Sequence, residues 1–95
     1  MDSDLTLTID APEQGVLELR ITTALGREIA HEIVRYEGHV DNLLLTTVDN
    51  LFNRNTLDRF ALKSVAPGQG IDKDSSLYRI VQSFASAVAE AHRRP

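Results

Sequence analysis

Two short segments, Val65-Ala66-Pro67-Gly68 and Leu77-Tyr78-Arg79-Ile80, lie eight residues apart and guide the interpretation of the whole chain. A proline followed by glycine is typical of a tight turn, so the first segment predicts a strand that ends in a turn. The second segment opens a run of apolar residues at helical spacing. That run comprises Leu77, Ile80, Val81, Phe84 and Val88. Asp74 or Ser75 can cap this helix, so we expect a strand, a turn, a loop and an amphipathic helix.

The residues before this unit predict three strands. Apolar and polar residues alternate with a period of two over 5–10, 17–22 and 29–36, and turn residues separate the three runs. Because the connections are short, sequential strands are expected to be neighbours in the sheet. The sequence therefore predicts a three-stranded antiparallel meander.

From Val40 the apolar period becomes helical, and Asn53 and Asn55 are expected to end this first helix. Its predicted apolar face comprises Val40, Leu44, Val48, Leu51 and Phe52. Phe60, Leu62 and Val65 then mark a fourth strand. A helix between two strands favours a crossover and hence a parallel strand pair beside the meander.

The resulting order, βββαβα, predicts an α/β fold in which residues 1–95 form a single domain. We expect both helices to pack on one face of a sheet made of the meander plus one parallel strand. This order resembles the first half of a ribonuclease H-like domain, the unit that actin-like ATPases duplicate. A chain of 95 residues with 42% hydrophobic content can bury one core.

Composition excludes several classes of function. The net charge of −4 argues against binding to a phosphate backbone, which requires clustered Lys and Arg. The basic run His92-Arg93-Arg94 is explained by the dipole of a helix C-terminus. Without cysteine there is neither a disulfide nor a thiolate zinc site. The acidic start is unlike a signal peptide, and no stretch reaches the roughly 20 apolar residues of a membrane span. We expect a soluble, cytoplasmic protein.

Asp10, at the end of the first strand, occupies the position where ribonuclease H-like nucleases place a metal-binding carboxylate. Two-metal catalysis needs further carboxylates. The first helix offers Asp41 or Asp49, but the fourth strand ends without an acid, and Asp72 and Asp74 lie in the loop beyond it. A capping or solvated role for Asp10 is therefore favoured, with a small metal-dependent enzyme as the alternative.

The sequence also offers little support for a histidine metal site or a phosphate-binding loop. The three histidines, His31, His39 and His92, lack the spacing that places two metal ligands on one helical face. His31 is in phase with apolar strand residues, which favours a half-buried, hydrogen-bonded side chain. Gly68 and Gly70 precede a helix but come without a Walker-type lysine. We therefore predict no catalytic residue, no bound metal and no cofactor.

The two opening segments resemble those of the TsaB-like family, in which a strand runs into GPGSFTGLR and a helix begins with LRIG. Pro67 and Gly68 match the turn, Arg79 and Ile80 match the helix, and Ala66 replaces the first glycine. Two further matches are Asp10 at the end of the first strand and Asp49, which follows Val48 in the leucine-rich first helix. The loop from Gln69 to Ser76 is longer than the family's loop and lacks its phenylalanine-threonine-glycine core.

The resemblance implies a non-catalytic scaffold whose paired helices dock against a related catalytic subunit, in an assembly that makes threonylcarbamoyladenosine in tRNA. The implied interface residues, some of which must belong to the core, are Leu44, Leu45, Val48, Phe84 and Ala87. Ser83, Ala87 and Ala91 form a small-residue face that either packs within the domain or meets another chain. The implied partner is the catalytic threonylcarbamoyl-transferase subunit or a second copy of this chain. A generic homodimerisation domain with another partner is a further alternative.

Overall fold

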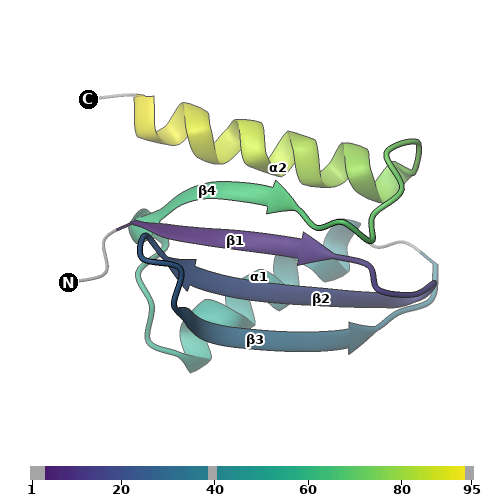
Figure 1. Ribbon diagram of the computed structural model, residues 1–95, viewed down its shortest axis with the longest axis horizontal. Coiled ribbons are helices and arrows are strands. Elements are labelled where there is room, and N and C mark those ends of the chain that lie inside the picture. The colour runs from purple at the N-terminus through teal and green to yellow at the C-terminus, as the bar shows by residue number, and fades with distance from the viewer. Residues whose placement is uncertain (1–3, 39–40, 94–95) are drawn as a thin grey trace.

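The computed structural model describes residues 4–38 and 41–93 and contains one four-stranded sheet with two helices (Figure 1). The elements, in chain order, are β1 (Leu5–Asp10), β2 (Val16–Thr23), β3 (Glu28–Arg35), α1 (Asp41–Arg54), the 3-10 helix η1 (Arg59–Ala61), β4 (Leu62–Pro67) and α2 (Ser76–Arg93). The strand order is β3-β2-β1-β4, with β1 and β4 parallel and the other pairs antiparallel. The predicted α/β fold and its βββαβα order are confirmed.

Alternation in the strands divides the sheet into an apolar and a polar face. Leu5, Leu7 and Ile9 of β1 are at most 1% exposed, and their neighbours Thr6 and Thr8 lie on the opposite face. The fully buried residues of β2 and the helices that join this core are Leu17, Leu19, Ile21, Leu44, Leu51, Phe52 and Val81. Both helices therefore cover the same face, as expected, and in Figure 1 α1 lies behind the strands while α2 runs along the edge formed by β4.

The end of α1 is set by its C-terminal hydrogen bonds. The amide of Leu57 donates to the carbonyl of Phe52 over 2.9 Å, and the amide of Thr56 donates to the carbonyl of Asn53 over 3.3 Å. This is the pairing of a Schellman motif. Thr56 adopts the left-handed conformation that the motif requires, with φ of 54°. The helix ends at Arg54, so the predicted termination at Asn53 and Asn55 is confirmed to within a residue.

The start of α2 is capped by Ser75. Its Oγ accepts a hydrogen bond from the amide of Tyr78 over 3.2 Å and donates to the carbonyl of Asp72 over 2.6 Å. The Asp72 carboxylate in turn accepts from the amide of Asp74 over 3.0 Å. Of the two predicted caps, Ser75 is therefore the one used, and Asp74 belongs to the turn that precedes it.

The prediction that Phe60 belongs to the fourth strand is wrong. Phe60 lies in η1 and is 83% exposed. The carboxylate of Asp58 accepts from the amide of Phe60 over 2.9 Å, and the Asp58 carbonyl accepts from the amide of Ala61 over 3.0 Å. These bonds coil the chain, so that β4 begins only at Leu62.

The predicted apolar stripe of α2 is buried on one side only. Leu77 and Val81 are buried, whereas Ile80, Phe84 and Val88 are half-buried. The reason is that α2 covers β4, an edge strand, so part of the stripe extends beyond the sheet. Val40 and His39, both named in the sequence interpretation, lie outside the described residues. Within the described residues, neither helix has the length and apolar character needed to cross a membrane.

Candidate functional site

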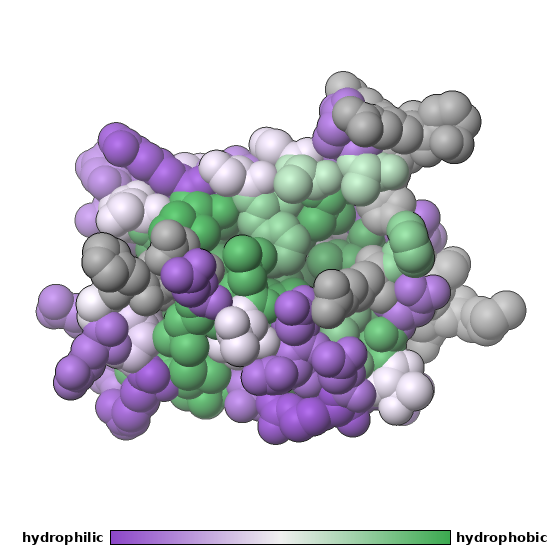
Figure 2. Space-filling model, turned by 180° about the vertical axis from the view of Figure 1, so that it is seen from behind, coloured by the Kyte–Doolittle hydropathy of each residue, from purple (hydrophilic) through white to green (hydrophobic). Residues whose placement is uncertain are grey.

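An apolar groove runs between α1 and α2 on the helical face of the molecule. Its volume is ≈ 500 Å³. The lining residues are Leu44, Leu45, Arg79, Ile80, Ser83, Phe84 and Ala87. Figure 2 shows hydrophobic side chains gathered across the middle of this face. Exposed apolar surface of this kind, rimmed by polar residues, is typical of a protein-binding site.

The five interface residues implied by the family resemblance divide into two groups. Leu44 and Val48 are buried in the core of this chain, at 0% and 7% exposure. Leu45 is 56% exposed, Phe84 is half-buried and Ala87 is exposed, and all three line the groove. Only the second group can meet a partner, because the first group already stabilises the packing of α1 on the sheet.

The small-residue face of α2 is open to solvent. Ser83, Ala87 and Ala91 are all exposed, so α1 does not close over this face. Of the two alternatives for these residues, close packing against α1 within the domain is therefore not the one that the structure shows. Both helices pack on the sheet through their buried residues. On the side away from the sheet they do not contact each other closely, and the space between them there is the groove.

Arg79 adds a positive charge to the groove. Its side chain is exposed and forms no hydrogen bond or ion pair with any part of the chain that the structure describes. Ile80, the next residue, is half-buried and faces the same groove. The two helix residues shared with the family motif thus lie at the candidate site rather than in the core.

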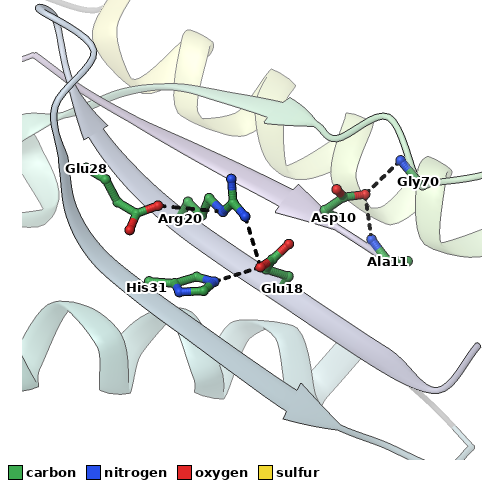
Figure 3. Close-up of polar contacts among 7 residues, drawn as sticks. All are labelled: Asp10, Ala11, Glu18, Arg20, Glu28, His31 and Gly70. Atoms are coloured by element: carbon green, nitrogen blue, oxygen red, sulfur yellow. Dashed lines mark hydrogen bonds and ion pairs between the residues drawn. The ribbon is translucent and has the colours of Figure 1, made fainter. Parts of the chain in front are cut away.

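Asp10 joins β1 to the loop that follows β4 (Figure 3). Its Oδ1 accepts hydrogen bonds from the amides of Ala11 and Gly70, each over 2.8 Å. The amide of Gly68 donates to the carbonyl of Ile9 over 2.8 Å. A Cβ on Gly68 or Gly70 would lie within 2.4–2.7 Å of Asp10 side-chain atoms. Asp10 therefore holds the turn after Pro67, and both glycines are required by the close approach.

A charged cluster covers the middle of the open, polar face of the sheet (Figure 3). The carboxylate of Glu18 lies 2.7 Å from Nε2 of His31 and 3.1 Å from a guanidinium nitrogen of Arg20. Arg20 also lies 3.6 Å from Glu28. The hydrogen bond with His31, followed by that with Arg20, holds the pKa of Glu18 below its ordinary value of 4.5.

The cluster was only partly visible in the sequence. The expected hydrogen bond of His31 is present, to Glu18, but the expectation that His31 is half-buried is wrong, because its side chain lies exposed on the open face of the sheet. The partner itself was missed, because it depends on the pairing of β2 with β3, where Arg20 is opposite His31 and Glu18 is opposite Ile33. The alternation of Glu18 and Arg20 along β2 was the available signal.

The carboxylates considered for a metal enzyme do not gather. No group of three or more His, Asp or Glu side chains is placed to hold a metal ion within the described residues. Asp10 is engaged by backbone amides, Asp49 lies on α1, and Asp72 forms the turn before α2. The side chains of Asp41 and His92 lie outside the described residues. The metal-enzyme alternative thus gains no geometric support from the described residues.

Comparison with known proteins identifies solved structures with a similar fold. No protein-family model and no curated protein matches the sequence. Among solved structures, YeaZ (TsaB) from Pseudomonas aeruginosa is similar with a TM-score of 0.71 and 20% identity, over 97% of this chain and 41% of that chain. The same values hold for a structure described as an uncharacterized protein with similarity to peptidase YEAZ from Pseudomonas aeruginosa.

The likeness confirms the TsaB-like resemblance at the level of fold. The present chain spans 41% of the length of these solved chains, so the likeness concerns one half-domain of each.

Proposed function

We propose that this chain is a non-catalytic interaction subunit, a half-domain over residues 1–95 that docks a helix-bearing partner protein in the groove between α1 and α2. The observation that carries the proposal is the exposed apolar lining of that groove, in which Leu45 is 56% exposed and Ile80 and Phe84 are half-buried. Such side chains are otherwise unfavourable on a surface that is acidic and polar.

The energetics favour a helix as the bound element. Burial of one exposed Leu or Phe side chain contributes about 1.5–3 kcal/mol, and a few apolar anchors carry most of the affinity of a typical interface. Leu45 and Phe84 lie on opposite walls of the groove. A partner helix that enters between them would contact both anchors and would complete a layer of packed helices over the sheet.

The partner suggested by the fold is a related catalytic subunit. TsaB-like proteins are scaffolds for a threonylcarbamoyl-transferase, and the same role here makes the chain a cytoplasmic component that supports threonylcarbamoyladenosine modification of tRNA. The charged groups of the open sheet face are already paired with one another, as Glu18 and Arg20 are, so the helical face is the better candidate for docking.

The test measures mass by light scattering, for the chain alone and mixed with the threonylcarbamoyl-transferase subunit of the same organism. We expect a stoichiometric complex that Leu45→Glu weakens. Leu25→Glu is the matched control, because Leu25 is 97% exposed in the β2–β3 turn, outside the groove.

A second pair of variants tests the α2 wall of the groove. Ala87→Glu should weaken the complex, and Ala89→Glu, on an exposed part of the same helix outside the groove, should not. Circular dichroism establishes that each variant is folded. Equal binding by the groove variants and their controls, or no complex at all with the catalytic subunit, would contradict the proposal.

A further inference from the structure

We infer that the free edge of β3 binds an extended segment of a partner protein, which adds a strand antiparallel to β3 and places alternate side chains in a groove between β3 and α1. This site is separate from the groove between α1 and α2 and goes beyond the proposed function. The unpaired backbone groups of β3, the groove beside them and the pairing of the nearby charges support the inference.

The backbone of β3 offers hydrogen bonds to another strand. β3 lies at one edge of the sheet, with β2 as its neighbour among the strands that the structure describes (Figure 1). The amide of Tyr36, directly after β3, donates to the carbonyl of Gly15 over 2.8 Å and therefore points toward β2. Backbone groups alternate in direction along a strand. The amides and carbonyls of His31, Ile33 and Arg35 thus point away from β2, toward the free edge.

The middle of β3 lacks the features by which proteins usually protect such an edge, namely a bulge, a proline or charges that extend over it. Its pairing with β2 is regular over residues 30–35, and the register shift of β3 lies before them. The side chain of His31 is bound to Glu18 of β2, and Glu32 forms an ion pair with Arg54 of α1. A strand can therefore approach the middle of β3 without meeting an unpaired charge.

A groove of ≈ 490 Å³ lies beside this edge, between β3 and α1. Val34 of β3 and Leu43 of α1 are half-buried in its lining, and the exposed Thr46, Asn50 and Asn53 form a polar row along α1. Hydroxyl and amide side chains can both donate and accept hydrogen bonds. The two charged residues of the lining are the ion pair described above. The groove therefore suits uncharged polar side chains.

The open face of the sheet adds an apolar contact, because Ile33 is 57% exposed there. An antiparallel strand would set one residue directly opposite Ile33, with Cβ atoms about 4.5–5.5 Å apart. Successive side chains alternate between faces, so the neighbours of that residue enter the groove. The partner segment is therefore an alternation of apolar and uncharged polar residues. About five residues of it span the outward-facing groups of β3.

A synthetic peptide tests the inference. It has about ten residues of alternating valine and threonine, with a lysine at each end, and its binding is measured by fluorescence anisotropy. We expect saturable binding, with slower hydrogen exchange at the amides of His31, Ile33 and Arg35 in NMR spectra. With valine opposite Ile33, the valine amides face β3 and the threonine amides face solvent. N-methylation of the valines should therefore abolish binding, whereas N-methylation of the threonines should preserve it.

Variants locate the bound peptide on the chain. Ile33→Pro removes an amide that faces away from β2, a position at which an edge strand accepts proline. It should weaken binding at least about tenfold relative to Ile33→Thr, which keeps that amide. Asn50→Lys should also weaken binding, because it places a charge in the groove, whereas Asn42→Lys, exposed on α1 outside the groove, should not. Circular dichroism establishes that each variant is folded.

Three outcomes would overturn the inference. The first is no binding at about 1 mM peptide, or equal binding of the two methylated peptides. The second is binding that Leu45→Glu weakens and Ile33→Pro does not, because the peptide then lies between α1 and α2. The third is association of two copies of the chain that Ile33→Pro abolishes, without any binding of the peptide.

Discussion

Gly68→Ala, alone and combined with Asp10→Ala, tests how the turn after β4 is held. A Cβ on Gly68 would lie 2.4 Å from Cγ and 2.6 Å from Cβ of Asp10, distances that real Cβ contacts essentially never show. The φ angle of Gly68 is outside the left-handed region, so the backbone itself accepts alanine. We therefore predict that the clash with Asp10 is the whole cause of destabilisation in Gly68→Ala.

The magnitudes follow from the hydrogen bonds of Asp10. Its Oδ1 accepts from the amides of Ala11 and Gly70 at 2.8 Å. Because bonds to a charged group contribute about 1.5–3 kcal/mol and this site is partly exposed, Asp10→Ala should cost roughly 2 kcal/mol. Gly68→Ala should cost about 2–3 kcal/mol, since it overpacks the turn and displaces the same carboxylate. The Cβ of residue 10 remains in Asp10→Ala, so the contact at 2.6 Å persists in the double variant, but the loss of the hydrogen bonds of the carboxylate is then counted only once. The double variant should therefore cost about 1–2 kcal/mol less than the sum of the two single variants.

Urea unfolding followed by circular dichroism at pH 7 measures the free energies of unfolding for the four proteins of this cycle. For a domain of this size, 1 kcal/mol corresponds to a change in Tm of about 4–8 °C, so thermal melts provide an independent reading. Gln69→Ala, an exposed residue in the same loop, is the control and should change stability by less than about 0.5 kcal/mol. Additive costs, or a neutral Gly68→Ala, would refute the reasoning.

Two further predictions concern the C-terminus of α1 and the open sheet face. Thr56→Gly should raise the free energy of unfolding by about 0.5–1 kcal/mol, because Thr56 has a φ of 54° and glycine adopts that conformation without strain; a Tm no higher than that of Thr56→Ala would contradict this. The pKa of Glu18 is lowered by the hydrogen bonds with His31 and Arg20, so its ionised form stabilises the fold above pH 4.5, and that contribution is lost as the pH falls below this value. Glu18→Gln should therefore flatten the acid limb of a stability-versus-pH curve, and an acid limb identical to that of the unsubstituted protein would contradict this.

The sequence predicted the elements because their signals are local. The alternation of Leu5, Leu7 and Ile9 requires one buried face whatever the strand pairs with, and the Ser75 cap depends on residues within one turn. Phe60 was wrongly assigned to a strand because its apolar side chain was the only signal used. Its backbone forms a 3-10 helix, since its amide donates a hydrogen bond to the carboxylate of Asp58, and the apolar pattern does not indicate this bond.

The candidate groove was only half predictable. The family resemblance named Leu44, Leu45 and Val48 together because they lie close in sequence, and only the packing of α1 on the sheet separates the buried Leu44 from the exposed Leu45. The close approach of Gly70 to Asp10 joins residues 60 positions apart, so no sequence pattern indicated it.

By itself, the sequence determined the order of strands and helices, the buried faces of β1 and β2 and the absence of cysteine chemistry, since these depend on side-chain periodicity and composition. It did not determine the buried face of β3, in which Ala30 is buried and Ile33 is 57% exposed. Only the tertiary structure decided which apolar residues remain exposed. That outcome depends on where α2 lies relative to the edge strand β4 and on how far it is held from α1, and both are set by packing between residues distant in the chain. The exposed part of an apolar helix face is what the rest of the fold leaves uncovered, and it is there that the proposed docking site lies.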